Sequence, residues 1–360
     1  MKLSIIVLVL VTNTCLFAQD QKYYFYRPDN NFGSDLVFNP ISQILNGGFD
    51  IFRNGGHSKD IFNQPYSQGA KNVINNIFNP LDSIKKFGWK RFITTEVFPI
   101  STNTDKLQYF PNYAHHLIGH GFRYVKTAEW YDYHNVKYPN AWSILTLFSY
   151  VFLNETLENG GFDEVNVDPI ADMLIFNPLG ILLFSTEWAK KFFSRTLQLY
   201  DWSLQPVFNI SNNNIINAGD QFAAKIKLNK KYGAFFYWGI SGIVGLSHQF
   251  KKGRTLSWGV GTIVNKLIER KLINSKYVSR FVAPNKIDGA VGFFYDVNNS
   301  LMTSMIFTGP HSYNYRLNIY PGFIKKDWFK PGLFLSVGEL DKFQIGLTLA
   351  SMPIVPGFGD

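Results

Sequence analysis

The stretch Gln221–Asn229, QFAAKIKLN, decides the fold class of the C-terminal part of this 360-residue chain. Its apolar side chains occupy every second position, so that Phe222 and Ile226 share one face and Lys225 lies on the other. Because successive side chains of a strand point to opposite faces, this pattern predicts a β-strand with one apolar and one polar face. Similar alternation occurs in the segments 202–210, 221–229, 234–250, 255–265, 289–297, 300–308, 313–320, 331–338 and 342–350.

The faces opposite the apolar ones are rich in Gly, Ser, Asn and Gln and poor in Asp and Glu. About 9–11 residues suffice for a tilted strand to cross a bilayer, and alternation of apolar-out with polar-in residues is typical of outer-membrane barrels. We therefore predict an α+β protein whose residues 202–360 form an antiparallel barrel of eight to ten strands, with Arg91–Phe98 as a candidate extra strand. A soluble periplasmic β-domain is the alternative, because such domains also alternate.

The N-terminus predicts export. A basic start at Lys2, the apolar run Ser4–Val11 and the small residue Ala18 are typical of a secretory signal peptide over residues 1–18. The single cysteine, Cys15, lies within it, so we expect a mature chain without thiols, which excludes disulfides and thiolate metal sites. Lipidation of Cys15 is the alternative.

The formal net charge of +9 belongs to the C-terminal part of the chain. Residues 1–200 carry 17 basic and 17 acidic side chains, whereas residues 201–360 carry 18 basic and 9 acidic ones. Six of the basic residues lie in Lys266–Lys286, which we expect to be a long extracellular loop. Since Lys and Arg bind phosphate well, lipopolysaccharide and anionic lipid are the expected partners and nucleic acid is not; a solvated loop without a partner is the alternative. The candidate binding residues are Lys266, Arg270, Lys271, Lys276 and Arg280.

Residues 36–201 are predicted to be helical, after an irregular segment at 19–35. The main helical segments are Asn112–His134, Pro139–Asn159 and Asp168–Tyr200. Proline at the start and glycine after the end of the second segment are typical helix boundaries. No apolar run reaches the ~20 residues of a spanning helix, and Asn177-Pro178 interrupts the best candidate, Ile170–Phe184.

Polar residues on these helical segments form a candidate site. His116 and His120 are four residues apart and Glu155 and Glu158 are three apart, so each pair shares a helix face. An imidazole beside a carboxylate can act as a general base with its orienting partner, and His116, His120 and Glu155 can ligate a divalent metal. The candidate catalytic residues are His116, His120, Glu155, Glu158 and Asp172.

The alternatives for these residues are structural. Glu155 and Glu158 can be the solvated end of a helix, and Asp168 can be the N-cap of the next helical segment. The sequence lacks the G-x-S-x-G, P-loop and G-x-G-x-x-G motifs, and no cofactor is predicted.

Four stretches of the same helical part form a pattern: Asn112-x3-His116, Gly119-His120-Gly121-x2-Tyr124, Glu155-x2-Glu158 and Asp168–Gly180 (DPIADMLIFNPLG). Over about residues 112–184 this pattern resembles an uncharacterised domain family of bacterial envelope proteins. This sequence departs from the family's pattern at His120 and in carrying both Asp168 and Asp172. The resemblance implies an envelope location and a helical domain but no reaction, since the family has no established activity.

These features together favour an exported outer-membrane protein with a structural or lipopolysaccharide-interacting role. A membrane-associated hydrolase or acyltransferase that uses the His/Glu/Asp residues is one alternative. A soluble periplasmic binding module is the other.

Overall fold

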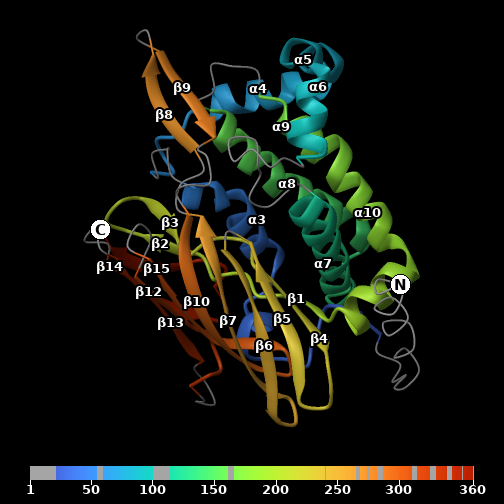
Figure 1. Ribbon diagram of the computed structural model, residues 1–360, viewed down its shortest axis with the longest axis vertical. Helices are drawn as coiled ribbons and strands as arrows, with labels where there is room; N and C mark the ends of the chain where they lie inside the picture. The colour runs from blue at the N-terminus through green and yellow to red at the C-terminus, as the bar shows by residue number, and fades with distance from the viewer. Residues whose placement is uncertain are drawn as a thin grey trace, which may run out of the picture.

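The computed structural model describes residues 22–54, 60–99, 113–160, 166–239, 241–264, 268–273, 276–281, 287–309, 314–324, 330–338, 343–350 and 352–359. The predicted signal peptide and Cys15 lie outside the described residues. Helices precede strands along the chain, and the change falls between Thr196 and Leu199. The α+β class predicted from the sequence is confirmed (Figure 1).

The described residues of the helical part form α-helices, a 3-10 helix (η1) and several π-helices (η2, η4, η5 and η6). Their bounds are α2 Gly33–Leu36, α3 Pro40–Gly48, η1 Asp50–Asn54, α4 Tyr66–Phe78, α5 Pro80–Phe87, α6 Trp89–Phe92, η2 Ile93–Val97, η4 Tyr113–His120, α7 Gly121–Tyr133, α8 Pro139–Asn159, α9 Asp168–Ile170, η5 Ala171–Phe176, α10 Asn177–Ser185, α11 Glu187–Lys191 and η6 Phe192–Thr196. The candidate strand Arg91–Phe98 is wrong, because it forms the end of α6 and the π-helix η2. Phe92 and Val97, five residues apart, contact one apolar cluster, which a π-turn allows and an alternating strand does not.

The helix Asp168–Ser185 is continuous through Asn177-Pro178, which we expected to interrupt it. The π-turns of η5 directly precede Pro178, and a proline lacks the N–H that a regular helix would need there. Among the described residues it is the one helix whose 18-residue length and composition suffice to cross a membrane, and half of it is buried inside the protein.

Thirteen strands form one large mixed sheet. Their bounds are β1 Leu199–Asp201, β2 Val207–Asn209, β3 Asn214–Ile216, β4 Phe222–Lys227, β5 Tyr232–Trp238, β6 Ser241–Lys251, β7 Arg254–Val264, β10 Ile287–Val297, β11 Ser300–Thr308, β12 Tyr315–Ile319, β13 Pro331–Val337, β14 Phe343–Leu349 and β15 Val355–Gly359. The order is β1-β4-β5-β6-β7-β10-β11-β12-β13-β14-β15-β2-β3, antiparallel except between β15 and β2.

This sheet differs from the expected barrel of eight to ten strands. The segment 234–250 divides into β5 and β6, and β15 was not predicted at all. The order begins at β1 and ends at β3, so the described strands do not close into an antiparallel barrel. Instead one segment, Leu199–Asn209, borders β4 through β1 and borders β15 through β2.

The basic segment Lys266–Lys286 also differs from the expected loop. Its described residues form the hairpin of β8 (Ile268–Ile273) and β9 (Lys276–Phe281). In Figure 1 this hairpin projects away from the large sheet. Ile268 and Leu272 are separated by Glu269-Arg270-Lys271, a run of three charged residues, so no period of two indicates a strand there.

Residues 22–48, here called the N-terminal segment, lie between the helices and the sheet, as the position of α3 in Figure 1 shows. Val37, which follows α2, packs with Trp202, Phe235 and Phe294 in one buried cluster. The helices have a second core, in which Phe122 and Phe184 contact Phe222 of β4. Both clusters therefore include side chains from the first strands of the sheet, Phe222 of β4 and Phe235 of β5.

The face of the sheet that packs against the N-terminal segment carries many polar groups. Lys225 and Asp296 form an ion pair there with both side chains at most 5% exposed. The remaining buried polar residues on the strands include Ser241, Ser247, Ser257, Asp288, Ser304, Asn318, Ser336 and Thr348. Buried polar groups need partners, and the N-terminal segment supplies several of them.

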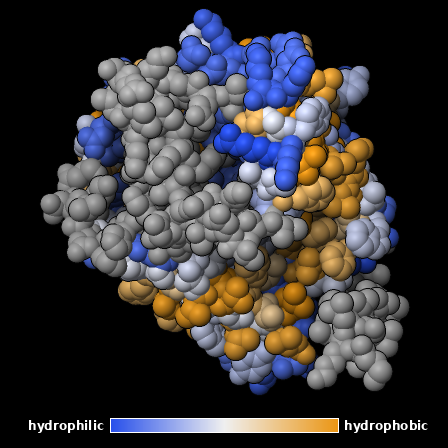
Figure 2. All heavy atoms as spheres, turned by 45° about the horizontal axis from the view of Figure 1, so that its top comes forward, coloured by the Kyte–Doolittle hydropathy of each residue, from blue (hydrophilic) through white to orange (hydrophobic). Residues whose placement is uncertain are grey.

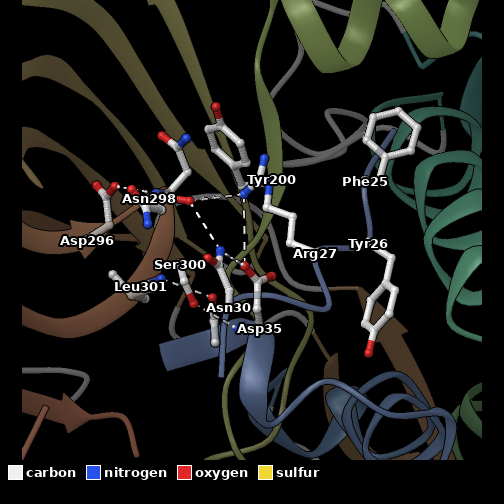
Figure 3. A network of polar contacts seen from close by, with 12 residues as sticks. Phe25, Tyr26, Arg27, Asn30, Asp35, Tyr200, Asp296, Asn298, Ser300 and Leu301 are labelled. Atoms are coloured by element: carbon white, nitrogen blue, oxygen red, sulfur yellow. Dashed lines mark hydrogen bonds and ion pairs between the residues drawn. The ribbon is translucent and has the colours of Figure 1, made fainter. Parts of the chain in front are cut away.

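Figure 3 shows how the N-terminal segment meets the strands β10 and β11. The backbone N–H of Asp35 donates to Ser300 Oγ at 3.0 Å, and the N–H of Leu301 donates to Ser34 Oγ at 3.0 Å. Asn30 Nδ2 donates to the Asp35 carboxylate at 2.8 Å, and Lys126 of α7 lies 3.3 Å from the same carboxylate. Asp35 thus connects the N-terminal segment, a helix and the sheet.

The Glu129 carboxylate fixes the start of this segment on α7. Its oxygens accept the backbone N–H groups of Tyr24, Phe25 and Tyr26 at 2.7, 2.8 and 2.8 Å. Burial raises the pKa of Glu129, and the three N–H donors lower it in part. Hydrogen bonds to a charged acceptor are the stronger kind, so this contact holds the segment against the helix.

We expect Glu129→Gln to lower the free energy of unfolding by about 2–3 kcal/mol, because an amide offers one acceptor oxygen in place of two charged ones. The measurement is denaturant unfolding of the purified protein. Glu187→Gln is the matched control: Glu187 accepts from Tyr24 Oη at an exposed position, and its loss should cost under about 0.5 kcal/mol. Equal effects of the two variants would contradict the role given to Glu129.

Candidate functional site

Close backbone contact brings the candidate site together. A Cβ atom on Gly121 would lie 2.7 Å from the Gly180 carbonyl oxygen, and one on Gly180 would lie 2.6 Å from the Leu117 carbonyl oxygen. Only glycine permits this approach of η4 and α7 to α10. It places the histidines of η4 beside Asn177 and Asp172.

Three imidazoles are packed against one another in this site. The ring centroids of His116 and His120 are 4.6 Å apart, those of His115 and His120 are 4.8 Å apart, and those of His115 and His116 are 5.3 Å apart. The π-helix η4 has more residues per turn than an α-helix, so residues four and five positions before His120 both face it. Sequence reasoning assumed an α-helix and therefore placed only His116 beside His120.

Each of two imidazoles has a polar partner on another element. His116 Nε2 lies 2.9 Å from Asp172 Oδ2. His120 Nδ1 lies 2.8 Å from Asn177 Oδ1, and its Nε2 lies 3.8 Å from Asp220 Oδ2. Burial lowers the pKa of His116 to about 4 and that of His120 well below its usual value, so both rings are neutral at pH 7.

Two glutamates at the end of α8 are buried beside the histidines. Glu155 is 2% exposed and Glu158 is 6% exposed, so the alternative of a solvated helix end is wrong. Their carboxylate oxygens and one of Asp168 lie within 4.8 Å of one another. The predicted capping role of Asp168 is not seen, because α9 begins with this residue. Burial, followed by the neighbouring Asp172, raises the pKa of Glu155 well above its usual value.

Arg123 of α7 joins this site to the first strands. It is 1% exposed, and its Nη1 lies 2.6 Å from Asp220 Oδ1 while its Nε lies 3.5 Å from Asp201 Oδ2. Its Nη2 donates to Ser203 Oγ at 2.5 Å. Burial raises the pKa of Asp220 to about 6, although Arg123 opposes the shift.

The structure thus brings all five predicted catalytic residues into one buried region. The three predicted metal ligands, His116, His120 and Glu155, do not form one group of ligands. His120 lies with His115 and Asp220, Glu155 lies with Glu158 and Asp168, and His116 pairs with Asp172. Asp220, Arg123 and Asn177 were missed. Asn177 belongs to the NPLG stretch, but nothing near Asp220 or Arg123 in the sequence signals a partner some 100 residues away.

The predicted lipid-binding residues that the structure describes belong to other elements than this site. Arg270 and Lys271 are on β8, and Lys276 and Arg280 are on β9. Lys266 lies outside the described residues. In the register of the hairpin, Arg280 is opposite Glu269.

The arrangement can perform two kinds of chemistry. His116 with Asp172 is a neutral imidazole oriented by a carboxylate, as in general-base catalysis. Two nitrogens and one oxygen, from His115, His120 and Asp220, are close enough to hold a metal ion.

Comparison with protein-family models, with curated proteins and with solved structures finds no match for this chain.

We expect Arg123→Met to lower the free energy of unfolding by about 3–5 kcal/mol, because it leaves two buried carboxylates, Asp201 and Asp220, without their cation. Denaturant unfolding measures the effect. Adding Asp220→Asn to Arg123→Met should restore part of the loss, since one of the uncompensated charges is removed. A loss below about 1 kcal/mol for the single variant would show that the ion cluster is not stabilising.

Proposed function

We propose that this chain is an exported outer-membrane protein whose sheet faces lipid. The observation that carries the proposal is a row of exposed apolar side chains that continues from strand to strand. Its members are paired in register across eight adjacent strands from β5 to β14. The row consists of Phe236, Val244, Val260, Val291, Phe307, Tyr315, Val337 and Phe343, all exposed except Tyr315, which is half-buried.

Apolar side chains as exposed as those of this row are not expected to face water. Val244 and Val260, opposite each other on β6 and β7, are 59% and 65% exposed. A second row beside it includes Leu246, Phe293 and Phe358, which are also exposed. Large contiguous apolar surfaces are rare on monomeric soluble proteins and mark membrane or protein contacts. The opposite face of the same strands is buried and carries many polar groups beside its aromatic side chains, so the exposed face is the more uniformly apolar one, as in a membrane sheet.

The helices contribute further apolar surface. Figure 2 shows hydrophobic residues gathered over the lower and right-hand parts of the surface, with hydrophilic residues at the top. This supports a lipid-facing zone that includes helices as well as strands. The exposed apolar residues of α8, η5, α10 and α11 include Trp142, Leu145, Leu174, Leu179, Leu182 and Trp188.

We infer further that the strands form a barrel-like wall around the N-terminal segment. The segment Leu199–Asn209 borders both ends of the antiparallel run β4–β15, which supports a wall closed by one short stretch of chain. The Trp202 N–H donates to the Gln221 carbonyl on one side, and the Val355 N–H donates to the Pro206 carbonyl on the other. Such an interior is filled by protein, so the role we propose is structural or lipid-interacting and not that of an open pore.

We expect Val260→Arg to lower the free energy of unfolding from phospholipid vesicles by about 2–4 kcal/mol, the cost of an arginine near the bilayer midplane. Gln249→Arg, at the exposed end of β6, is the matched control and should cost about 0–1 kcal/mol. The measurement is denaturant titration of the vesicle-bound protein. Equal small effects, or recovery of the protein from cells without detergent, would overturn the membrane assignment.

Lipopolysaccharide phosphates are the partner we propose for the basic hairpin β8–β9. Replacing Arg270, Lys271, Lys276 and Arg280 together by glutamine should weaken binding to lipopolysaccharide vesicles and reduce its dependence on salt, because each cation pairs with phosphate.

The matched control for the hairpin variant removes four exposed lysines in or beside turns at the other end of the strands: Lys227, Lys230, Lys231 and Lys252. It should bind lipopolysaccharide vesicles as the unmodified chain does. Equal binding by all three proteins in a vesicle flotation assay would eliminate the hairpin as the binding surface.

A further inference from the structure

We propose that His115, His120 and Asp220 bind one divalent transition-metal ion. Each of these residues offers a ligand atom, and the three atoms lie within 4.8 Å of one another. A tetrahedral ion about 2.1 Å from its ligands spaces them about 3.4 Å apart, so small side-chain rotations suffice to complete the site. This inference does not depend on the membrane location proposed above.

Contacts around His120 prepare its ring for a metal. Asn177 Oδ1 is an acceptor, so the His120 Nδ1 that lies 2.8 Å away carries the proton. The lone pair is then on Nε2, the atom that faces Asp220 at 3.8 Å. A second polar partner that fixes the tautomer and orientation of a histidine is the usual arrangement around metal ligands.

Asp220 is held in the same way. Arg123 Nη1 lies against its Oδ1 at 2.6 Å, while its Oδ2 is the atom nearest to His120. Asp220 is completely buried, so the orientation of its carboxylate is set by these contacts. A buried carboxylate that shows one oxygen to two imidazoles is suited to ligation.

The charges that surround the site favour a cation. Arg123 contacts two buried carboxylates, those of Asp201 and Asp220, so these three side chains together carry a charge of −1. Buried charges in proteins are paired or coordinate metals.

The ligand set selects the class of ion. Two imidazoles with one carboxylate are typical of zinc and of Fe(II), Mn, Co or Ni sites, whereas Mg²⁺ and Ca²⁺ prefer oxygen ligands only. Three protein ligands leave further coordination positions open, as in catalytic rather than structural sites.

The test uses the full chain in detergent, purified through a tag without histidines, freed of metal with a chelator and titrated with Co²⁺ or Zn²⁺. We expect one ion per chain, with the visible absorption of Co²⁺ showing nitrogen and oxygen ligands. Asn177→Leu should weaken affinity by about 10- to 100-fold, and His115→Gln and Asp220→Asn should weaken it at least as much. His134→Gln, which removes an exposed imidazole that stacks on Trp130, is the matched control and should change nothing.

Circular dichroism verifies that each variant is folded. Because His115 is the least buried of the three ligands, we expect His115→Gln to fold. Three results would overturn the proposal. These are no binding by the unmodified chain, unchanged binding in folded His115→Gln, and a preference for Mg²⁺ or Ca²⁺ over Zn²⁺, which would place the cation at the glutamates.

Discussion

The buried polar face of the sheet is the constraint on which the rest of the structure depends. A buried polar group is costly without a partner. Asp296 finds its partner on another strand, Lys225 of β4, whereas Ser300 Oγ and the N–H of Leu301 find theirs outside the strands, at Phe32 and Ser34. The N-terminal segment resolves this, because Ser34, Asp35 and Asn30 exchange hydrogen bonds with β11 and its preceding turn. The buried face of the sheet is therefore covered by protein that offers polar partners to it.

The same segment also determines where the helices lie. Glu129 binds three of its backbone N–H groups, and Lys126 binds Asp35, so α7 is attached to the sheet through the segment between them. Arg123, one turn earlier on α7, reaches Asp201 and Asp220 directly. Because Arg123, Lys126 and Glu129 recur at three-residue intervals, they lie on neighbouring turns of one side of the helix. A single helix thus aligns the core, the sheet and the histidine site.

Part of the candidate site could be predicted from the sequence. Spacings of three and four residues identified Glu155 with Glu158 and His116 with His120, since those intervals repeat on any helix. The place of His115 beside His120 could not be predicted in this way, because it depends on the π-helix η4. This π-helix directly precedes Gly121, which packs against Gly180. Asp220 could not be found either. It lies between β3 and β4, and its approach to His120 is a contact between two layers that no local pattern encodes.

The sequence by itself determined the α+β class, the helical segments and the alternation of the strands, because each depends on the local period of apolar residues. The tertiary structure decided which sheet those strands build. It joined β15 in parallel to β2, and it used Leu199–Asn209 to border both ends of the antiparallel run. It also decided that five scattered polar residues share one buried region. The reason is that strand order and buried ion pairs arise from contacts between distant segments, whose energies depend on burial and on partners that a period of two or 3.6 residues cannot specify.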